Sequence, residues 1–87
     1  MKINSVLIID DEIDICVLLK NFLRNKSERV LCSTTLNDGF SKFKELKPDL
    51  LILDHNLPDG HGIENISNFK NQNSSLYIIV ISAMSNL

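Results

Sequence analysis

The sequence has few of the residues that mark metal-rich or disulfide-rich proteins: two cysteines, two prolines and three glycines in 87 residues, and no tryptophan. Cys16 and Cys32 do not have a Cys-x-x-Cys or other metal-ligand spacing, which excludes a site built from cysteine ligands. We therefore expect both cysteines to be reduced and to act as small buried hydrophobic residues in a reducing compartment.

Long hydrophobic runs and an excess of basic charge are lacking as well. The longest uncharged apolar run, residues 76–81, is too short to cross a membrane, and no signal-peptide pattern precedes the acids at Asp10 and Asp11. Nine basic and 11 acidic residues give a net charge of -2, which leaves no basic stripe for nucleic acid. We expect a cytoplasmic domain that binds neither membrane nor nucleic acid.

What remains is the composition of one globular domain, 44% hydrophobic and 23% charged. Four runs have the character of strands, three of them continuous aliphatic stretches typical of strands buried on both faces: residues 5–10, 29–33, 49–54 and 76–82. Apolar residues spaced three and four apart predict helices between these runs, at residues 12–25, 36–46 and 63–69. This alternation predicts an α/β fold in which a parallel sheet has helices on its faces.

The second predicted helix has two local features. Thr35 and Asp38 resemble a capping box at its start. Gly39 inside it costs roughly 1 kcal/mol relative to alanine, which a tight approach of the helix to the sheet would explain.

Acidic side chains end two of the predicted strands. Asp10 and Asp11 follow the first strand and Asp54 ends the third, while Ser82 ends the fourth. In a flavodoxin-like strand order of 2-1-3-4, the first and third strands are neighbours, so the three acids converge at one sheet edge. Close carboxylates cannot all stay ionised alone, and an all-oxygen ligand set favours Mg²⁺. Acids with Mg²⁺ suggest phosphoryl chemistry, with Asp54 as a candidate nucleophile.

The stretches "LIIDDE", "DLLILDHNLPDGHG" and "VISA" together resemble the receiver domain of two-component response regulators, over the whole chain. The paired acids and the D-x-N-x-P-x-x-x-G pattern carry most of the resemblance. It implies a CheY-like, three-layer α/β/α fold and a signalling role in a phosphorelay, with no enzymatic turnover beyond the domain's own phosphorylation and dephosphorylation.

The resemblance also implies residue roles. Asp54 would accept a phosphoryl group from a sensor histidine kinase or a phosphotransfer protein. Asp10, Asp11 and the backbone carbonyl of Asn56 would hold Mg²⁺ together with Asp54, and Ser82 would hydrogen-bond a phosphoryl oxygen in the active state.

Two other classes of protein are compatible with parts of the pattern. A haloacid-dehalogenase-like phosphohydrolase also phosphorylates an aspartate at a strand end. Its motif resembles D-x-D, in which the second acid protonates the leaving group, and Asn56 at that position cannot act as a general acid. A pseudo-receiver would keep the fold as an interaction module without being phosphorylated. We expect His55 and His61, beside the acids, to be solvent-facing loop residues and not metal ligands.

The chain departs from the receiver pattern at its carboxyl end. Ala83 would leave room for the phosphoryl group, but the expected fifth strand, its lysine and the last two helices do not follow before Leu87. We therefore expect residues 1–87 to be an incomplete receiver domain that self-associates through the face left bare.

Overall fold

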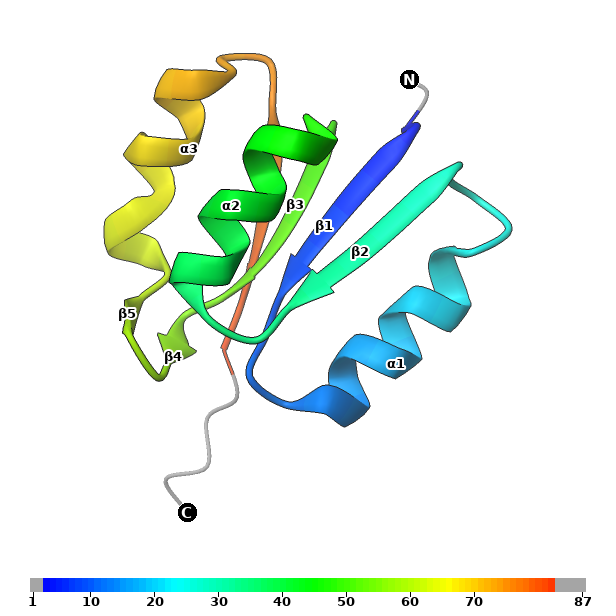
Figure 1. Cartoon of the computed structure of the whole chain (residues 1–87), viewed down its shortest axis with the longest axis horizontal. Coiled ribbons are helices and arrows are strands. Elements are labelled where there is room, and N and C mark those ends of the chain that lie inside the picture. Colours follow the sequence, from blue (N-terminus) through cyan, green and yellow to red (C-terminus); the bar gives the residue numbers. More distant parts are fainter. Residues whose placement is uncertain (1–2, 83–87) are drawn as a thin grey trace.

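The computed structural model describes residues 3–82 of the chain. Helices and strands alternate along it as predicted (Figure 1). The strands are β1 Ser5–Ile9, β2 Arg29–Ser33, β3 Leu50–Asp54, β4 Asn56–Leu57, β5 Gly60–His61 and β6 Tyr77–Ile81. The helices are α1 Ile13–Leu23, α2 Leu36–Leu46, the 3-10 turn η1 Ile63–Asn65 and α3 Ile66–Gln72.

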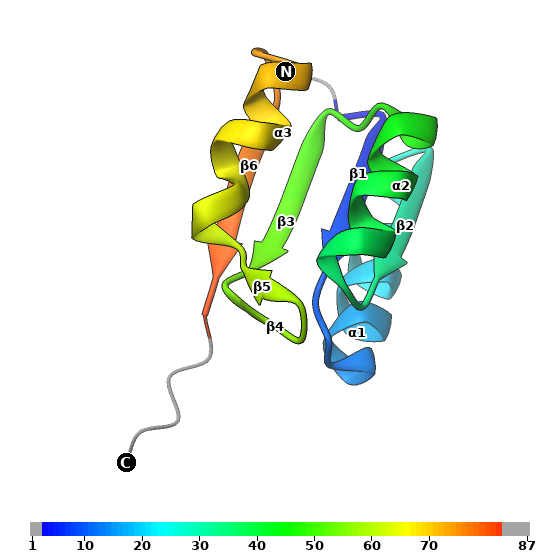
Figure 2. The same cartoon turned by 60° about the vertical axis from the view of Figure 1, so that its left-hand side comes forward.

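Four of the strands form one parallel sheet in the order β2-β1-β3-β6. Since β6 is the fourth long strand, the predicted order 2-1-3-4 is confirmed. Helices α2 and α3 lie on one face of the sheet and α1 on the other, as Figure 2 shows, which gives three layers. The short antiparallel pair β4-β5 occupies a segment that the sequence analysis treated only as a loop.

The central strands are buried because their aliphatic side chains face helices on both sides. Every side chain from Val6 to Ile9 is 0% exposed. On the face toward α2 and α3, Phe69 lies at the centre of the core, and its ring stacks on Phe40 at 4.5 Å and tilts against Phe43 at 5.0 Å. This core holds α2 and α3 against the sheet. The segment between β3 and α3 is therefore held at the carboxyl edge of the sheet.

Helix α2 begins as its sequence predicts. The Thr35 hydroxyl oxygen accepts a hydrogen bond from the Asp38 N–H at 3.1 Å, which is the N-cap half of a capping box. The reciprocal half is not formed, because the Asp38 carboxylate pairs with Lys42 at 3.0 Å instead. At the other end Lys47 adopts a left-handed backbone with φ of 52° immediately before Pro48 and stops the helix.

Gly39 lies where α2 approaches the sheet, as expected. A Cβ at this position would collide with the side chain of Ile9, which is itself fully buried. The cost of glycine in a helix is therefore offset by close packing of α2 on β1.

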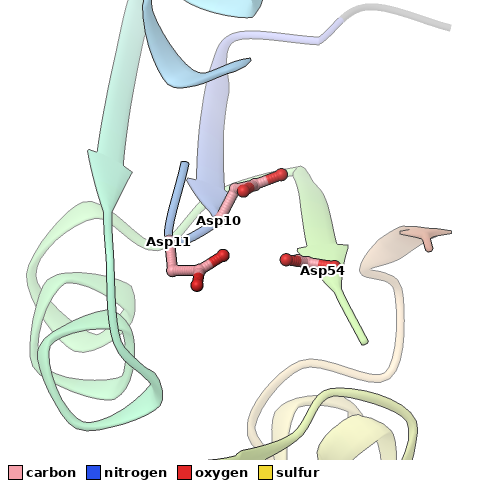
Figure 3. A group of neighbouring side chains, drawn as sticks. All are labelled: Asp10, Asp11 and Asp54. Carbon is pink, nitrogen blue, oxygen red and sulfur yellow. The ribbon is translucent and has the colours of Figure 1, made fainter. Parts of the chain in front are cut away.

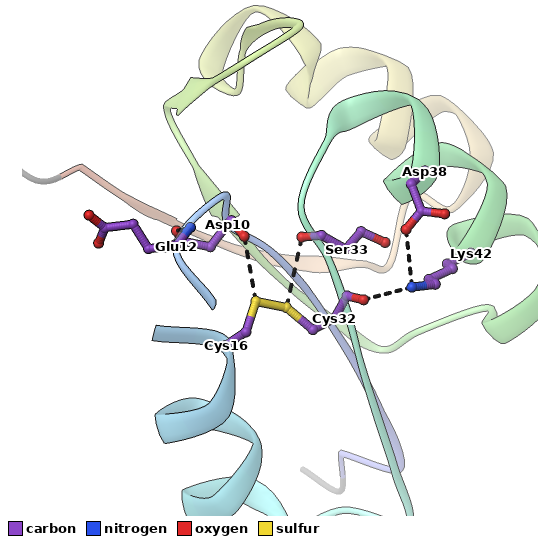
Figure 4. The surroundings of a disulfide bond; sticks show 7 residues. All are labelled: Asp10, Glu12, Cys16, Cys32, Ser33, Asp38 and Lys42. Carbon is purple, nitrogen blue, oxygen red and sulfur yellow. Dashed lines mark hydrogen bonds and ion pairs between the residues drawn. A yellow bond between two sulfur atoms is a disulfide. The ribbon is translucent and has the colours of Figure 1, made fainter. Parts of the chain in front are cut away.

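Cys16 is buried as expected, but the expectation that both cysteines are reduced was wrong. Cys16 of α1 and Cys32 of β2 form a disulfide, with Cα atoms 6.0 Å apart (Figure 4). Chain spacing alone could not show this, because the pairing depends on α1 lying directly over β2. Among the residues described, none of the helices has the length and apolarity that a membrane crossing requires.

Candidate functional site

Three carboxylates meet at the carboxyl edge of the sheet, as the sequence predicts. Asp10 and Asp11 follow β1, and Asp54 is the last residue of the neighbouring strand β3. Each offers an oxygen, and these oxygens all lie within 4.8 Å of one another (Figure 3). The carboxylates of Asp11 and Asp54 point toward each other in this view. Parallel pairing of β1 with β3 is the direct cause of this cluster.

Two of the three acids are buried. Asp10 is 3% exposed and Asp54 is 8% exposed, whereas Asp11 is open to solvent. The Glu12 N–H donates to Asp10 Oδ1 at 2.8 Å, and the Asn56 N–H donates to Asp54 Oδ1 at 3.3 Å. Each buried carboxylate is thus oriented by the backbone of the segment that follows it, two residues along the chain.

Burial raises the pKa of both Asp10 and Asp54 above the ordinary value of 3.8. The backbone hydrogen bonds from Glu12 and Asn56 partly oppose this rise in pKa, and the neighbouring acidic charges add to it. The site therefore has a deficit of positive charge, and a bound cation would relieve it.

The hollow around the cluster is lined by oxygen-bearing side chains and two aliphatic ones, at Asp10, Asp11, Glu12, Ile15, Asp54, Asn56, Ile81 and Ser82. Within the described part of the chain this lining contains no lysine and no arginine. Carboxylate oxygens beside an open hollow fit Mg²⁺, which prefers carboxylates and retained waters. The residues therefore suit the ion that the sequence analysis expected.

Asn56 and Ser82 both line the same hollow as the acids, as expected from their positions after β3 and β6. The His55 N–H donates to the Ile81 carbonyl at 2.9 Å, which ties the segment after β3 to the end of β6 and so to Ser82. Ala83 lies outside the described residues.

The expectation that both histidines face solvent is met by His61 and not by His55. His61 is exposed, but His55 is half-buried, and their rings stack with centroids 5.0 Å apart. The Nδ1 atom of His55 accepts a hydrogen bond from the Ile63 N–H at 3.4 Å. The pair packs the β4-β5 hairpin against the start of η1 and thereby supports the loop beside Asp54.

Sequence reasoning missed one residue that shapes this loop. The Asp59 carboxylate accepts hydrogen bonds from the Leu36 N–H at 2.8 Å and the Asn37 N–H at 2.9 Å, at the start of α2. These bonds lower the pKa of Asp59. The only local signal is the Asp-Gly pair after Pro58, which predicts a turn and says nothing about α2.

Gly62 has a similar supporting role. A Cβ there would collide with the backbone carbonyl of Asp54, and the Gly62 N–H donates to the His55 carbonyl at 2.8 Å. The glycine that ends the D-x-N-x-P-x-x-x-G pattern therefore lets the hairpin close directly against the end of β3.

Comparison with known proteins finds a family model and relatives that are response regulators. Residues 6–87 match the response regulator receiver domain family. The chain is 43% identical over 81 residues to the KDP operon transcriptional regulatory protein KdpE of Escherichia coli, covering 93% of this chain and 36% of that protein. It is 34% identical to the chemotaxis protein CheY of Thermotoga maritima, covering 91% of this chain and 67% of CheY.

Among solved structures, the chain resembles the signal receiver domain of a putative Luxo repressor protein from Vibrio parahaemolyticus. The TM-score is 0.79 at 26% identity, with 100% of this chain and 66% of that one covered. The chain thus spans about a third of the length of KdpE and two thirds of the length of CheY.

Proposed function

Because this chain belongs to the family of response regulator receiver domains, we propose that Asp54 accepts a phosphoryl group from a sensor histidine kinase or a phosphotransfer protein and so switches a signalling output. The observation that carries the proposal is the cluster of three carboxylates within 4.8 Å at the ends of β1 and β3, with Asp54 itself buried beside a hollow.

The acids of the cluster have different tasks. Asp54 is the nucleophile: one of its carboxylate oxygens forms the new bond to phosphorus while the bond between phosphorus and the donor nitrogen breaks, and the electron pair returns to that nitrogen. The Asn56 N–H at Asp54 Oδ1 holds the carboxylate in one orientation for attack. This role requires Asp54 to be ionised, although burial raises its pKa.

Asp10, Asp11, Asp54 and the backbone carbonyl of Asn56 would hold Mg²⁺. When bound, the ion supplies positive charge for the carboxylates and the phosphoryl oxygens. The Glu12 N–H fixes Asp10 Oδ1 at 2.8 Å, which keeps this ligand directed into the hollow. Ser82, in the same hollow, would hydrogen-bond a phosphoryl oxygen after transfer.

The domain has no substrate to turn over in this proposal. It catalyses at most its own phosphorylation and dephosphorylation. We place it in the cytoplasm, where a kinase or phosphotransfer protein would meet the hollow, and we assign it no contact with membrane or nucleic acid.

We also propose self-association through the face of the sheet that carries α1. On this face Leu18 is 64% exposed, Phe22 is 63% exposed and Ile79 of β6 is 51% exposed. Apolar side chains this open on the same side of the molecule favour contact with a second copy.

The phosphoacceptor assignment is tested with a small phosphodonor. We expect acetyl phosphate with Mg²⁺ to add the mass of one phosphoryl group to the protein at its natural length, and Asp54→Asn to abolish this addition. Asp14→Asn, which removes an exposed acid from the first turn of α1, is the matched control and should be modified at the parent rate.

Intact-protein mass spectrometry with and without a chelator gives the readout. Modification of Asp54→Asn at the parent rate would contradict the assignment. Modification that is indifferent to the chelator would contradict the magnesium site but not the phosphoacceptor.

A further inference from the structure

The disulfide lies beside the acid cluster. Cys16 is 5% exposed on the first half of α1, and Cys32 is half-buried near the end of β2. Their Cα separation of 6.0 Å lies within the usual range for a disulfide. The bond therefore links the helix that follows Asp10 and Asp11 to a strand of the sheet.

Cys16 contacts the backbone of Asp10 directly, and β2 holds the same backbone through Ser33, the residue after Cys32. The sulfur of Cys16 lies 3.5 Å from the Asp10 carbonyl oxygen. The Asp10 N–H donates to the carbonyl of Ser33, the residue after Cys32, at 3.0 Å. In Figure 4 one dashed line joins the Cys16 sulfur to Asp10, and another joins the Cys32 sulfur to Ser33. The peptide groups of a magnesium ligand are thus held by α1 on one side and β2 on the other.

The start of α1 extends this connection. The N–H of Cys16 donates to the Glu12 carbonyl at 3.2 Å, and the N–H of Glu12 donates to Asp10 Oδ1 at 2.8 Å. A displacement of Cys16 is therefore passed through one turn of backbone to the carboxylate of Asp10.

We propose that Cys16 and Cys32 form a reversible redox modification site that controls the order of the loop carrying Asp10 and Asp11. The disulfide holds this loop in place, and its reduction loosens the loop and weakens cation binding. The inference rests on the proposed function in two respects: the magnesium site, and a reducing compartment in which a disulfide is transient and regulatory instead of permanent.

The chemistry needs a peroxide as oxidant and a dithiol as reductant. The thiolate of Cys32, the more exposed of the two, attacks hydrogen peroxide and becomes a sulfenic acid, with hydroxide leaving. The Cys16 thiol then displaces water from this sulfur to form the disulfide. In sum, two thiols and one peroxide give one disulfide and two waters. A dithiol reverses the reaction by exchange, and is itself oxidised to a disulfide.

Reduction acts on the site because the covalent link is lost. The sulfur atoms of two thiols lie farther apart than the two sulfur atoms of a disulfide. On reduction, the sulfurs of Cys16 and Cys32 must therefore separate within a closely packed layer. The nearest groups that can move are the exposed Asp11, Glu12 and the first turn of α1.

The test compares the protein treated with hydrogen peroxide and the protein treated with dithiothreitol, after both reagents are removed. Alkylation under denaturing conditions followed by mass spectrometry should label no cysteine in the first sample and both in the second. Calorimetric titration with MgCl₂ should give an affinity at least about threefold lower after reduction. Amide hydrogen exchange at Asp11 and Glu12 should be faster in the reduced sample.

The double variant Cys16→Ala with Cys32→Ala is the matched control. It should bind Mg²⁺ like the reduced protein and should not respond to either reagent. If this variant unfolds, Cys32→Ala alone serves the same purpose, because a single cysteine cannot form the bond.

Two labelled cysteines after peroxide treatment would overturn the proposal. A disulfide that forms without changing either Mg²⁺ affinity or amide exchange would also overturn it. If neither form binds Mg²⁺, the magnesium site of the proposed function fails, whereas the exchange rates still decide whether the pair controls the loop.

Discussion

Two carboxylates of this molecule lie where water solvates them poorly, and the consequence is a linkage between protons and metal. Burial raises the pKa of Asp10 and Asp54 above 3.8, the value expected when the chain is unfolded. At a pH between the ordinary pKa of 3.8 and the raised pKa of the folded protein, the folded state binds more protons than the unfolded state. The metal-free protein should therefore lose stability as pH rises through that window.

Mg²⁺ should reverse this trend, because it competes with protons for the same oxygens. We expect MgCl₂ to raise the melting temperature most near pH 7 and least near about pH 4, because protons compete more strongly for the oxygens of Asp10 and Asp54 as the pH falls. Thermal unfolding with and without the salt, across that range, measures the effect.

Asp11→Asn should flatten the magnesium response, and the exposed Asp14→Asn should leave it unchanged. An equal response in Asp11→Asn and the parent, or a response independent of pH, would show that the cluster is not the binding site.

At the scale of elements, the sequence predicted what depends on local pattern. The alternation of aliphatic runs with helical patterns predicted a parallel sheet. The flavodoxin-like order for such sheets then placed β1 beside β3 and predicted the convergence of Asp10, Asp11 and Asp54. The segment after Asp54 was expected to be a loop, and in the structure it contains the short β4-β5 pair. Each of these features follows from residues that are neighbours in sequence or from general rules of parallel sheets.

Contacts between distant segments were not predictable in this way. The disulfide depends on the position of α1 over β2, and the bonds from Asp59 to the start of α2 join residues 23 positions apart. The stacking of His55 on His61 follows from the β4-β5 hairpin, whose two-residue strands carry no periodicity. A single sequence contains no pattern for such pairings.

The packing of α2 on β1 gives a sharp prediction at this scale. Gly39→Ala should destabilise the protein by about 1–3 kcal/mol, because its Cβ would collide with Ile9, which is fully buried. Helix propensity alone predicts the opposite, a gain of about 1 kcal/mol.

Ser41→Ala, at an exposed position of the same helix, is the matched control and should stabilise by a few tenths of a kcal/mol. Chemical denaturation of both variants decides the matter. A more stable Gly39→Ala variant would mean that α2 can move away from β1 at little cost.

At the scale of the whole molecule, the two faces of the sheet are covered unequally. Helices α2 and α3 cover one face, while α1 is the single helix over the other among residues 3–82 (Figure 2). Buried Leu50 and Ile52 pack in the layer under α1, but Ile79 of β6 on the same side is 51% exposed. A parallel sheet normally has both faces covered, so this side offers apolar surface to a partner.

The resulting prediction concerns association of the 87-residue chain. Covering about 400 Å² of apolar surface contributes about 10 kcal/mol before the costs of association, which is comparable to the stability of a small domain. We expect sedimentation velocity to show concentration-dependent association of this chain. Leu18→Gln with Phe22→Gln should shift it toward monomer, because these side chains are 64% and 63% exposed on α1. Lys20→Gln, on the same helix, should leave association unchanged. A monomer that unfolds cooperatively at every concentration would show that α1 alone covers this face sufficiently.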